Sequence, residues 1–386
     1  MELDQDQVFH LPDALKQREH ILVIGVGGGG GNALNHIIES GVVGVEFVAA
    51  NTDSKALGLN KAPHKIVLGE KLTKGLGAGA DPVVGMDAAK ESIDRIREYV
   101  SGADMVFVTA GMGGGTGTGA TPIIAEVAKE VGCLVVGVVT TPFRFELKKR
   151  ALVAQEGILK LKEKVDALLV VENDRLLNQI DDKTTSVVAY KMANEVLRQA
   201  VQGVTDMIMK PGVINVDFAD IKTVMKNAGS AIMGIGEGEG DNRAEMAAKA
   251  AIKSPLMSLP LKGAQGVLIN FEAGPDTALF EMTKAAELVN ETAGEGALVI
   301  WGHTISEEIG NKMRVTVIAT GFSDIKDRAS AISQQPSLNK MIRNVGVRAF
   351  SLDEKDLQAT GEGNNIFDSV PAIYDSPSIY RKKPPQ

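Results

Sequence analysis

The sequence predicts an α/β protein with a parallel sheet, followed by a smaller α+β module. Through the first half of the chain, short runs of Val, Ile and Leu alternate with helical stretches. That alternation is typical of parallel strands covered on both faces. Residues 184–209 contain Gly203 as their sole Gly or Pro, which predicts one long helix between two modules. A length of 386 residues also fits about two domains.

The expected elements follow from apolar runs, periodicity and breakers, taken in chain order. In the first module we expect strands at 21–24, 45–50, 66–68, 105–109, 134–140 and 168–171, and helices at 32–40, 84–100, 120–131 and 148–164. We expect the long helix to connect the two modules and not to form another layer on the sheet. Beyond it we expect helices at 217–227, 243–253 and 277–289, with strands at 266–271, 298–301 and 313–318.

The domain organisation follows from these elements. The predicted segments are a flexible start at 1–18, a nucleotide-binding domain at 19–183, the connecting helix at 184–212, an α+β domain at 213–323, a linker at 324–374 and an end peptide at 375–386. Little periodicity and 5 of the 14 Pro residues after position 323 predict a disordered tail. The amphipathic end peptide is either a docking motif or simply solvated chain.

Composition excludes several classes of function. A net charge of −8 and only 16 aromatic residues argue against nucleic-acid binding. No apolar run reaches 18 residues, and the acidic N-terminus lacks a signal pattern, so we expect a cytoplasmic protein without membrane insertion. The single Cys133 cannot form an internal disulfide and is expected to be buried in a strand.

A first glycine-rich loop follows the first strand. The run GVGGGGGN at 25–32 lies between a strand and a helix, where backbone N–H groups can approach a phosphate. It also matches the dinucleotide fingerprint G-x-G-x-x-G, and Asp53 stands roughly where that fingerprint places a ribose ligand. An NAD-dependent oxidoreductase is therefore an alternative interpretation at this point.

A second glycine loop favours a polyphosphate ligand. The run GMGGGTGTG at 111–119 holds six glycines in nine residues, more than a structural turn needs. Two such loops at the carboxyl ends of parallel strands can converge on one polyphosphate. Thr116 and Thr118 would add hydroxyl donors. No Walker A motif occurs, and a dinucleotide enzyme does not need the second loop.

These motifs carry a resemblance to a known family. GGGTGTG at 113–119 resembles the signature loop of the tubulin/FtsZ superfamily, and NVDFAD at 215–220 resembles the bacterial synergy loop. With TKGLGAG at 73–79 and PFRFE at 142–146, the similarity to the FtsZ family covers about residues 21–322. It implies a tubulin/FtsZ fold with a Rossmann-like GTPase domain. It also implies a GTP-hydrolysing protein that polymerises head-to-tail into the bacterial division ring.

The resemblance assigns the nucleotide contacts by motif. Phosphate and ribose contacts fall on Gly28, Gly29, Gly30, Gly31 and Asn32, and further phosphate contacts on Gly115, Thr116 and Gly117. Glu146 and Arg150 would reach the ribose and phosphates, Tyr190 would stack on the base, and Asn194 would bind its edge. Tyr190 and Asn194 are four residues apart and share a helix face. Alternatively, Tyr190 lies at the rim of the domain and Asn194 is only solvated, without a role in binding. In the family, the position of Asn194 is often Asp.

The hydrolytic residues implied by the resemblance are Asn215, Asp217 and Asp220, which would polarise the attacking water. Capping of a helix is the alternative role for Asp217. If Asn194 touches the base, 15 helical residues to Met209 place these acids about 22 Å further along. They would then reach the nucleotide of the next molecule, and a contact of that kind generates a filament.

The expected ligands and partners complete this interpretation. GTP and GDP are substrate and product, with Mg²⁺ held mainly by phosphates and water; the five scattered histidines suggest no other metal. The end peptide resembles the family's docking peptide for membrane-tethering proteins of the FtsA type, although IYR stands at 379–381 where Phe-Leu-Arg is frequent. A homologue that binds nucleotide without hydrolysing it is a further alternative.

Overall fold

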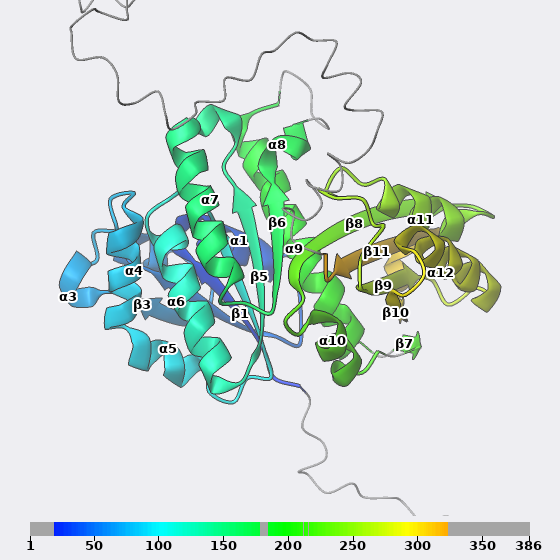
Figure 1. The fold of residues 1–386 in the computed structure, drawn as a ribbon, viewed down its shortest axis with the longest axis horizontal. Coiled ribbons are helices and arrows are strands. Elements are labelled where there is room, and N and C mark those ends of the chain that lie inside the picture. Colours follow the sequence, from blue (N-terminus) through cyan, green and yellow to red (C-terminus); the bar gives the residue numbers. More distant parts are fainter. Residues whose placement is uncertain (1–18, 178–183, 211, 215, 323–386) are drawn as a thin grey trace, which may run out of the picture. The chain divides into compact units, whose positions relative to one another are not determined.

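One sheet runs through the computed structural model, which describes residues 19–177, 184–210, 212–214 and 216–322. Its eleven strands lie in the order β3-β2-β1-β4-β5-β6-β8-β11-β9-β10-β7 (Figure 1). The parallel strands are β1 (Ile21–Val26), β2 (Glu46–Asn51), β3 (His64–Val67), β4 (Met105–Gly111), β5 (Leu134–Thr141) and β6 (Ala167–Glu172). The predicted strands of the first module are present, and Cys133 is buried directly before β5.

Helices cover both faces of these parallel strands. They are α1 (Gly27–Glu39), α2 (Ser54–Gly58), α3 (Glu70–Thr73), α4 (Pro82–Glu91), α5 (Ile93–Val100), α6 (Thr116–Val131), α7 (Lys148–Lys162) and α8 (Asn173–Leu176). Alternate residues of β1 pack into two separate cores: Ile21 and Val23 on one face, Leu22 and Ile24 on the other. The single helix predicted at 84–100 is wrong, because the chain breaks between α4 and α5 at Ser92.

The C-terminal half extends the same sheet. Its strands are β7 (Gly212–Ile214), β8 (Gly229–Glu239), β9 (Gly266–Ala273), β10 (Leu298–Ile305) and β11 (Lys312–Thr320), and its helices are α10 (Phe218–Met225), α11 (Arg243–Ile252) and α12 (Leu279–Ala293). β8 joins the two halves by pairing in parallel with β6 and antiparallel with β11. The domain boundaries proposed from the sequence stay a prediction.

Strand β8 was missed from the sequence because glycines interrupt its apolar pattern. Gly234, Gly236 and Gly238 alternate along it. A Cβ atom at each of these positions would lie 2.1 Å from a backbone carbonyl oxygen of α11. Glycine therefore allows the helix backbone to rest directly on the strand.

The long helix α9 (Ser186–Met209) is present between the two halves as predicted, and it is also packed into the core. Leu197, Val201 and Val204 are buried in the core that α9 shares with α1 and the strands. Figure 1 shows α9 running between the two halves of the sheet. The apolar stripe of a helix must be covered, and here strands from both halves cover it.

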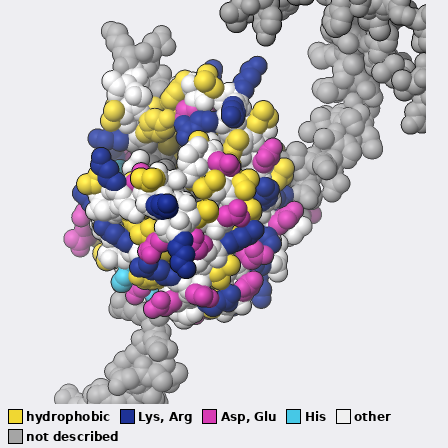
Figure 2. Space-filling view, turned by 90° about the vertical axis from the view of Figure 1, so that its left-hand side faces the viewer, with side chains coloured by type: hydrophobic (Ala, Val, Ile, Leu, Met, Phe, Trp, Pro, Cys, Tyr) yellow, Lys and Arg dark blue, Asp and Glu magenta, His cyan; other side chains and the backbone are white. Residues whose placement is uncertain are grey.

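The surface features agree with the charge composition. Figure 2 shows one face of the molecule, where Lys and Arg side chains lie among Asp and Glu and form no broad area of one sign. Across the described helices, none has the length and apolar character needed to cross a membrane.

Candidate functional site

The first glycine loop is itself the start of α1. The helix begins at Gly27, five residues earlier than predicted, with no side-chain cap and no acidic residue in its first turn. A Cβ atom on Gly30 would lie 2.3 Å from the Thr109 carbonyl oxygen, and one on Gly29 would lie 3.0 Å from the Gly111 Cα. The first N–H groups of α1 therefore have no side-chain partner, as an anion site at a helix N-terminus requires.

The second glycine loop meets the first. Helix α6 begins at Thr116 after the uncapped Gly115, again without an acid in its first turn. A Cβ atom on Gly27 would lie 2.8 Å from the Gly117 backbone N, so only glycine permits this contact. Two uncapped helix N-termini thus lie side by side, where their dipoles favour one polyphosphate.

The two threonines of this loop have different roles. The Thr116 hydroxyl lies 2.6 Å from that of Thr52 at the loop edge. The Thr118 hydroxyl is buried and accepts a hydrogen bond of 2.8 Å from the Gly113 N–H. Thr118 therefore holds the loop in shape, and a donor role of its hydroxyl toward phosphate stays a prediction.

A cavity of about 220 Å³ opens between α1, β5 and α9. Its lining includes Gly29, Asn32, Glu146, Arg150, Tyr190 and Asn194. The structure thus brings most of the predicted ribose and base residues to one cavity, next to the glycine loops. Gly28 and Gly31 lie on the other side of α1, where they line a separate cavity of about 300 Å³.

Side chains around the cavity hold one another in place. Glu146 forms an ion pair with Arg150 and accepts a hydrogen bond of 3.1 Å from the Phe143 N–H. The Tyr190 ring meets the stacked rings of Phe143 and Phe145 edge-on. Burial, followed by the nearby Glu146 carboxylate, raises the pKa of the Tyr190 hydroxyl. Tyr190 therefore presents a neutral aromatic ring to any ligand.

Asn173 is a candidate residue that the sequence reasoning missed. It is the first residue of α8, directly after β6, and lines the same cavity. Only 3% of its surface is exposed, and no group in the described part of the chain forms a hydrogen bond with its Oδ1 atom. A buried polar atom without a partner is costly, and a ligand in the cavity can supply one. Its place at the carboxyl end of a parallel strand was a signal available in the sequence.

The predicted catalytic acids lie elsewhere on the chain. Asp217 caps α10, because its Oδ1 accepts a hydrogen bond of 2.9 Å from the Asp220 N–H. Both carboxylates are exposed, and neither lines the cavities beside the glycine loops. Asn215 lies outside the described residues. In the described part of the chain, no group of three or more His, Cys, Asp or Glu side chains could hold a metal ion.

Asp53 was the expected ribose ligand if the protein bound a dinucleotide, but in the structure its side chain caps a helix. Its Oδ1 accepts hydrogen bonds of 2.9 and 3.0 Å from the N–H groups of Lys55 and Ala56, which caps α2. It lines neither cavity beside the glycine loops. Of the two observations behind the dinucleotide alternative, the glycine fingerprint and Asp53, capping of α2 therefore explains the second.

Comparison with known proteins identifies the family. The GTPase domain of the tubulin/FtsZ family matches residues 20–181, and the C-terminal domain of the FtsZ family matches residues 229–323. An FtsZ dimer from M. jannaschii is 42% identical over 80% of this chain and 90% of its own, with a TM-score of 0.76. The chain belongs to the FtsZ family. A mutant form of the M. jannaschii FtsZ is 43% identical over 80% and 93%, with a TM-score of 0.77.

More distant neighbours share the fold. CetZ2 from Haloferax volcanii, described as a GTPγS-bound protofilament, has a TM-score of 0.68 at 20% identity, over 84% of this chain and 97% of its own. The tubulin/FtsZ fold predicted from the glycine loops is thus confirmed. Membership of this family supports guanine-nucleotide binding, GTP hydrolysis and self-assembly in general terms.

Proposed function

We propose that this protein is a GTPase whose active site is completed between subunits of a head-to-tail filament, and that the filament forms the bacterial division ring. The main support is the position of Asp217 and Asp220, which lie apart from the cavity that Tyr190 and Asn194 line in the same chain. We call this cavity the nucleotide cavity. Asn194 and Met209 are separated by 15 residues of α9, which is about 22 Å of helix. In a head-to-tail stack, the exposed acids of one subunit would meet the nucleotide of the next.

The nucleotide cavity would bind GTP through its two ends. The uncapped starts of α1 and α6 would hold the phosphates through backbone N–H groups. At the other end, Tyr190 would stack on the base, and the amides of Asn194 and Asn173 would bind its edge. The unpartnered Oδ1 of Asn173 can accept from the N–H groups that guanine carries.

Hydrolysis would be phosphoryl transfer to water, in which positioning and charge neutralisation contribute most. Asp217, Asp220 and Asn215 of the neighbouring subunit would orient and polarise the attacking water. Mg²⁺, bound mainly by phosphate oxygens and water, would neutralise charge on the transferring group. After phosphate leaves, the contact between subunits would lose the interactions made by the γ-phosphate. Hydrolysis would therefore weaken this contact.

Exposed apolar side chains near the glycine loops support burial of this end in a subunit contact. Phe145, Leu147 and Leu76 are 51%, 73% and 85% exposed. Phe145 stacks on Phe143 beside the cavity, and Leu76 belongs to a loop bridged to Asp53. Large apolar groups that gather at one end of a soluble protein are typical of an interaction surface.

We further propose that the end peptide at 375–386 binds membrane-tethering division proteins of the FtsA type and places the filament at mid-cell in the cytoplasm. The peptide lies outside the described residues, so the support is its amphipathic sequence alone. A long linker before a short docking peptide suits a tether.

The concentration dependence of hydrolysis tests the shared site. Phosphate release with Mg²⁺ is measured over a series of protein concentrations, with ATP in place of GTP as control. We expect a rate per molecule that rises from near zero above a threshold, with GTP only. A constant rate per molecule would show that each chain hydrolyses alone.

Mixing two inactive variants tests which subunit supplies the acids. Asp217→Ala keeps the nucleotide site, whereas Gly117→Val blocks it, since a Cβ there lies 2.7 Å from the Gly111 carbonyl oxygen. In an equal mixture, random head-to-tail pairing would restore about one quarter of the wild-type rate. Asp241→Ala, an exposed acid of the same half, is the control and should stay active. An inactive mixture that still forms filaments would contradict the arrangement.

A further inference from the structure

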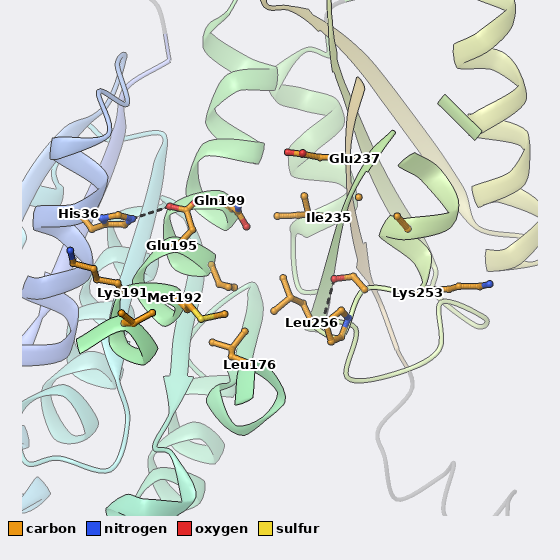
Figure 3. Close-up of a pocket in the computed structure, with 16 residues that line it drawn as sticks. His36, Leu176, Lys191, Met192, Glu195, Gln199, Ile235, Glu237, Lys253 and Leu256 are labelled. Carbon is orange, nitrogen blue, oxygen red and sulfur yellow. Dashed lines mark hydrogen bonds and ion pairs between the residues drawn. The ribbon is translucent and has the colours of Figure 1, made fainter. Parts of the chain in front are cut away.

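Helix α7 has an outer face with two exposed leucines. Leu152 and Leu159 keep 61% and 66% of their surface exposed. They line neither the cavities beside the glycine loops nor the cavity of about 730 Å³ that α9 forms with the C-terminal half (Figure 3). A small ligand covers apolar side chains inside a concave site. Leucines on the convex face of a helix need another protein surface to cover them.

The opposite side of α7 is packed on its own chain. Gly157 and Leu161 are buried there, and α7 contacts α6, β5 and β6 (Figure 1). A Cβ atom on Gly157 would lie 2.3 Å from the Thr118 methyl carbon, so glycine lets α7 rest closely on α6. At roughly 100° per residue, Leu152 and Leu159 point away from this buried side. The outer face of α7 therefore has no part in the fold of a single chain.

Exposed residues form one stripe along this outer face, because they follow one another at intervals of three or four. The stripe consists of Lys148, Leu152, Gln155, Glu156, Leu159 and Glu163. Lys148 is the first residue of α7, and Glu163 is its C-cap. The neighbouring Lys164 forms its ion pair with Glu126, at 2.6 Å. The α7 stripe thus has a cation at its start, an anion at its end and leucines between them.

The two end charges of the α7 stripe are placed against the dipole of their own helix. A cation is disfavoured at a helix N-terminus, and an anion is disfavoured at a C-terminus. Beside an antiparallel second helix, Lys148 would lie at the C-terminus of the partner and Glu163 at its N-terminus. Each charge would then lie where the partner helix favours it.

The α7 stripe also matches itself when it is reversed. In an antiparallel pair centred between residues 155 and 156, Leu152 faces Leu159 of the other copy and Lys148 faces Glu163. Two-fold symmetry repeats each contact, so the pair has two leucine contacts and two ion pairs. Glu156 alone meets its own counterpart near the axis, and this contact between like charges keeps the pair weak.

We propose that the α7 stripe is a docking surface for the α7 stripe of a second copy of this chain, antiparallel about a two-fold axis. The self-complementary order of its charges and leucines selects a second copy over another partner. One such contact is small, so free subunits pair weakly. In filaments, which rest on the function proposed above, the contact would join one filament to another.

A cysteine near the two-fold axis tests the symmetry. Gln155→Cys places a thiol beside its own counterpart, whereas a head-to-tail contact does not bring a residue against the same residue. The single native Cys133 is buried. In the full-length protein with GDP, copper phenanthroline should oxidise Gln155→Cys to a covalent dimer faster than Asp94→Cys, an exposed control on α5. Equal rates of cross-linking in the two variants would overturn the proposal.

Charge reversal in the Gln155→Cys protein tests the register. Lys148→Glu or Glu163→Lys alone should slow cross-linking about three- to tenfold, because like charges then face each other twice in the pair. The two changes together should restore the rate. Glu163→Lys makes the net charge of the chain less negative, so general repulsion between copies cannot explain slower cross-linking.

Lys71→Glu, an exposed residue of α3, is the control for Lys148→Glu and should cross-link like the parent protein. It changes the net charge by the same amount outside the α7 stripe. A double variant that cross-links no faster than either single variant would rule out this pairing of Lys148 with Glu163.

Discussion

Replacing Asn173 by Ala should separate nucleotide affinity from stability. Its amide is buried in the nucleotide cavity, and among the described residues its Oδ1 has no hydrogen-bond partner. If guanine supplies the missing donor, removing the amide leaves a buried N–H group of the base unmatched, which costs about 1–3 kcal/mol. At 1.4 kcal/mol for each factor of ten, the Kd for GTP should rise about 5- to 150-fold.

The free protein should be affected much less. Asn173→Ala removes a buried oxygen that already lacks a partner, and this gain offsets part of the packing loss. We therefore expect the free energy of unfolding without nucleotide to change by less than about 1 kcal/mol. The measurements are titration calorimetry with GTP and urea unfolding of the nucleotide-free protein.

Asn270 supplies the matched control. It is equally buried, but its Oδ1 accepts a hydrogen bond of 3.0 Å from the Thr304 hydroxyl. Asn270→Ala should lower the free energy of unfolding by about 1–3 kcal/mol and leave the Kd for GTP unchanged. A Kd in Asn173→Ala within twofold of wild type would refute the assignment of Asn173 to the base. Inosine triphosphate, which lacks the 2-amino group, would show whether that group is the donor.

Three further predictions concern the C-terminal half. Gly236→Ala should lower the free energy of unfolding by about 1–3 kcal/mol in urea, because its Cβ would lie 2.1 Å from the Ala247 carbonyl oxygen; an unchanged midpoint would mean that α11 shifts freely. Arg243→Met should lower the free energy of unfolding by about 1–3 kcal/mol, because the partly exposed Glu281 loses its ion pair with the buried guanidinium. A free energy of unfolding equal to wild type in calorimetry would contradict this. Burial lowers the pKa of His303, so the unfolded chain binds its proton more readily and stability falls as pH drops below about 6.5. His303→Leu should flatten the fall in thermal midpoint between about pH 7 and pH 5.5, and an identical slope would exclude His303 as a cause.

The sequence predicted the elements whose signals are local. Apolar runs located the parallel strands, and the absence of breakers located α9. The glycine runs after β1 and β4 predicted a phosphate site, because so many glycines serve little purpose in an ordinary turn. The family assignment rested on these same motifs and was confirmed. The roles of Asp217 and Asp220 stay a prediction.

Local signals failed where a distant segment decides the outcome. Strand β8 has glycines that its own pattern cannot explain, since the reason is the backbone of α11 lying against them. Thr118 has the hydroxyl group expected of a phosphate ligand, yet in the structure this hydroxyl accepts a hydrogen bond from the Gly113 N–H of its own loop. Asn173 shows no motif of its own, and its missing partner is visible only when the cavity forms around it.

The sequence by itself determined the family, most of the strands and helices of the first half, and the chemistry of the glycine loops, because propensity and spacing are properties of neighbouring residues. Tertiary structure alone decided that α9 is a core helix with a cavity on each of two faces, and that the acids of α10 lie apart from the nucleotide cavity. Burial, hydrogen-bond satisfaction and cavity shape depend on residues that are distant in the chain and meet only after folding.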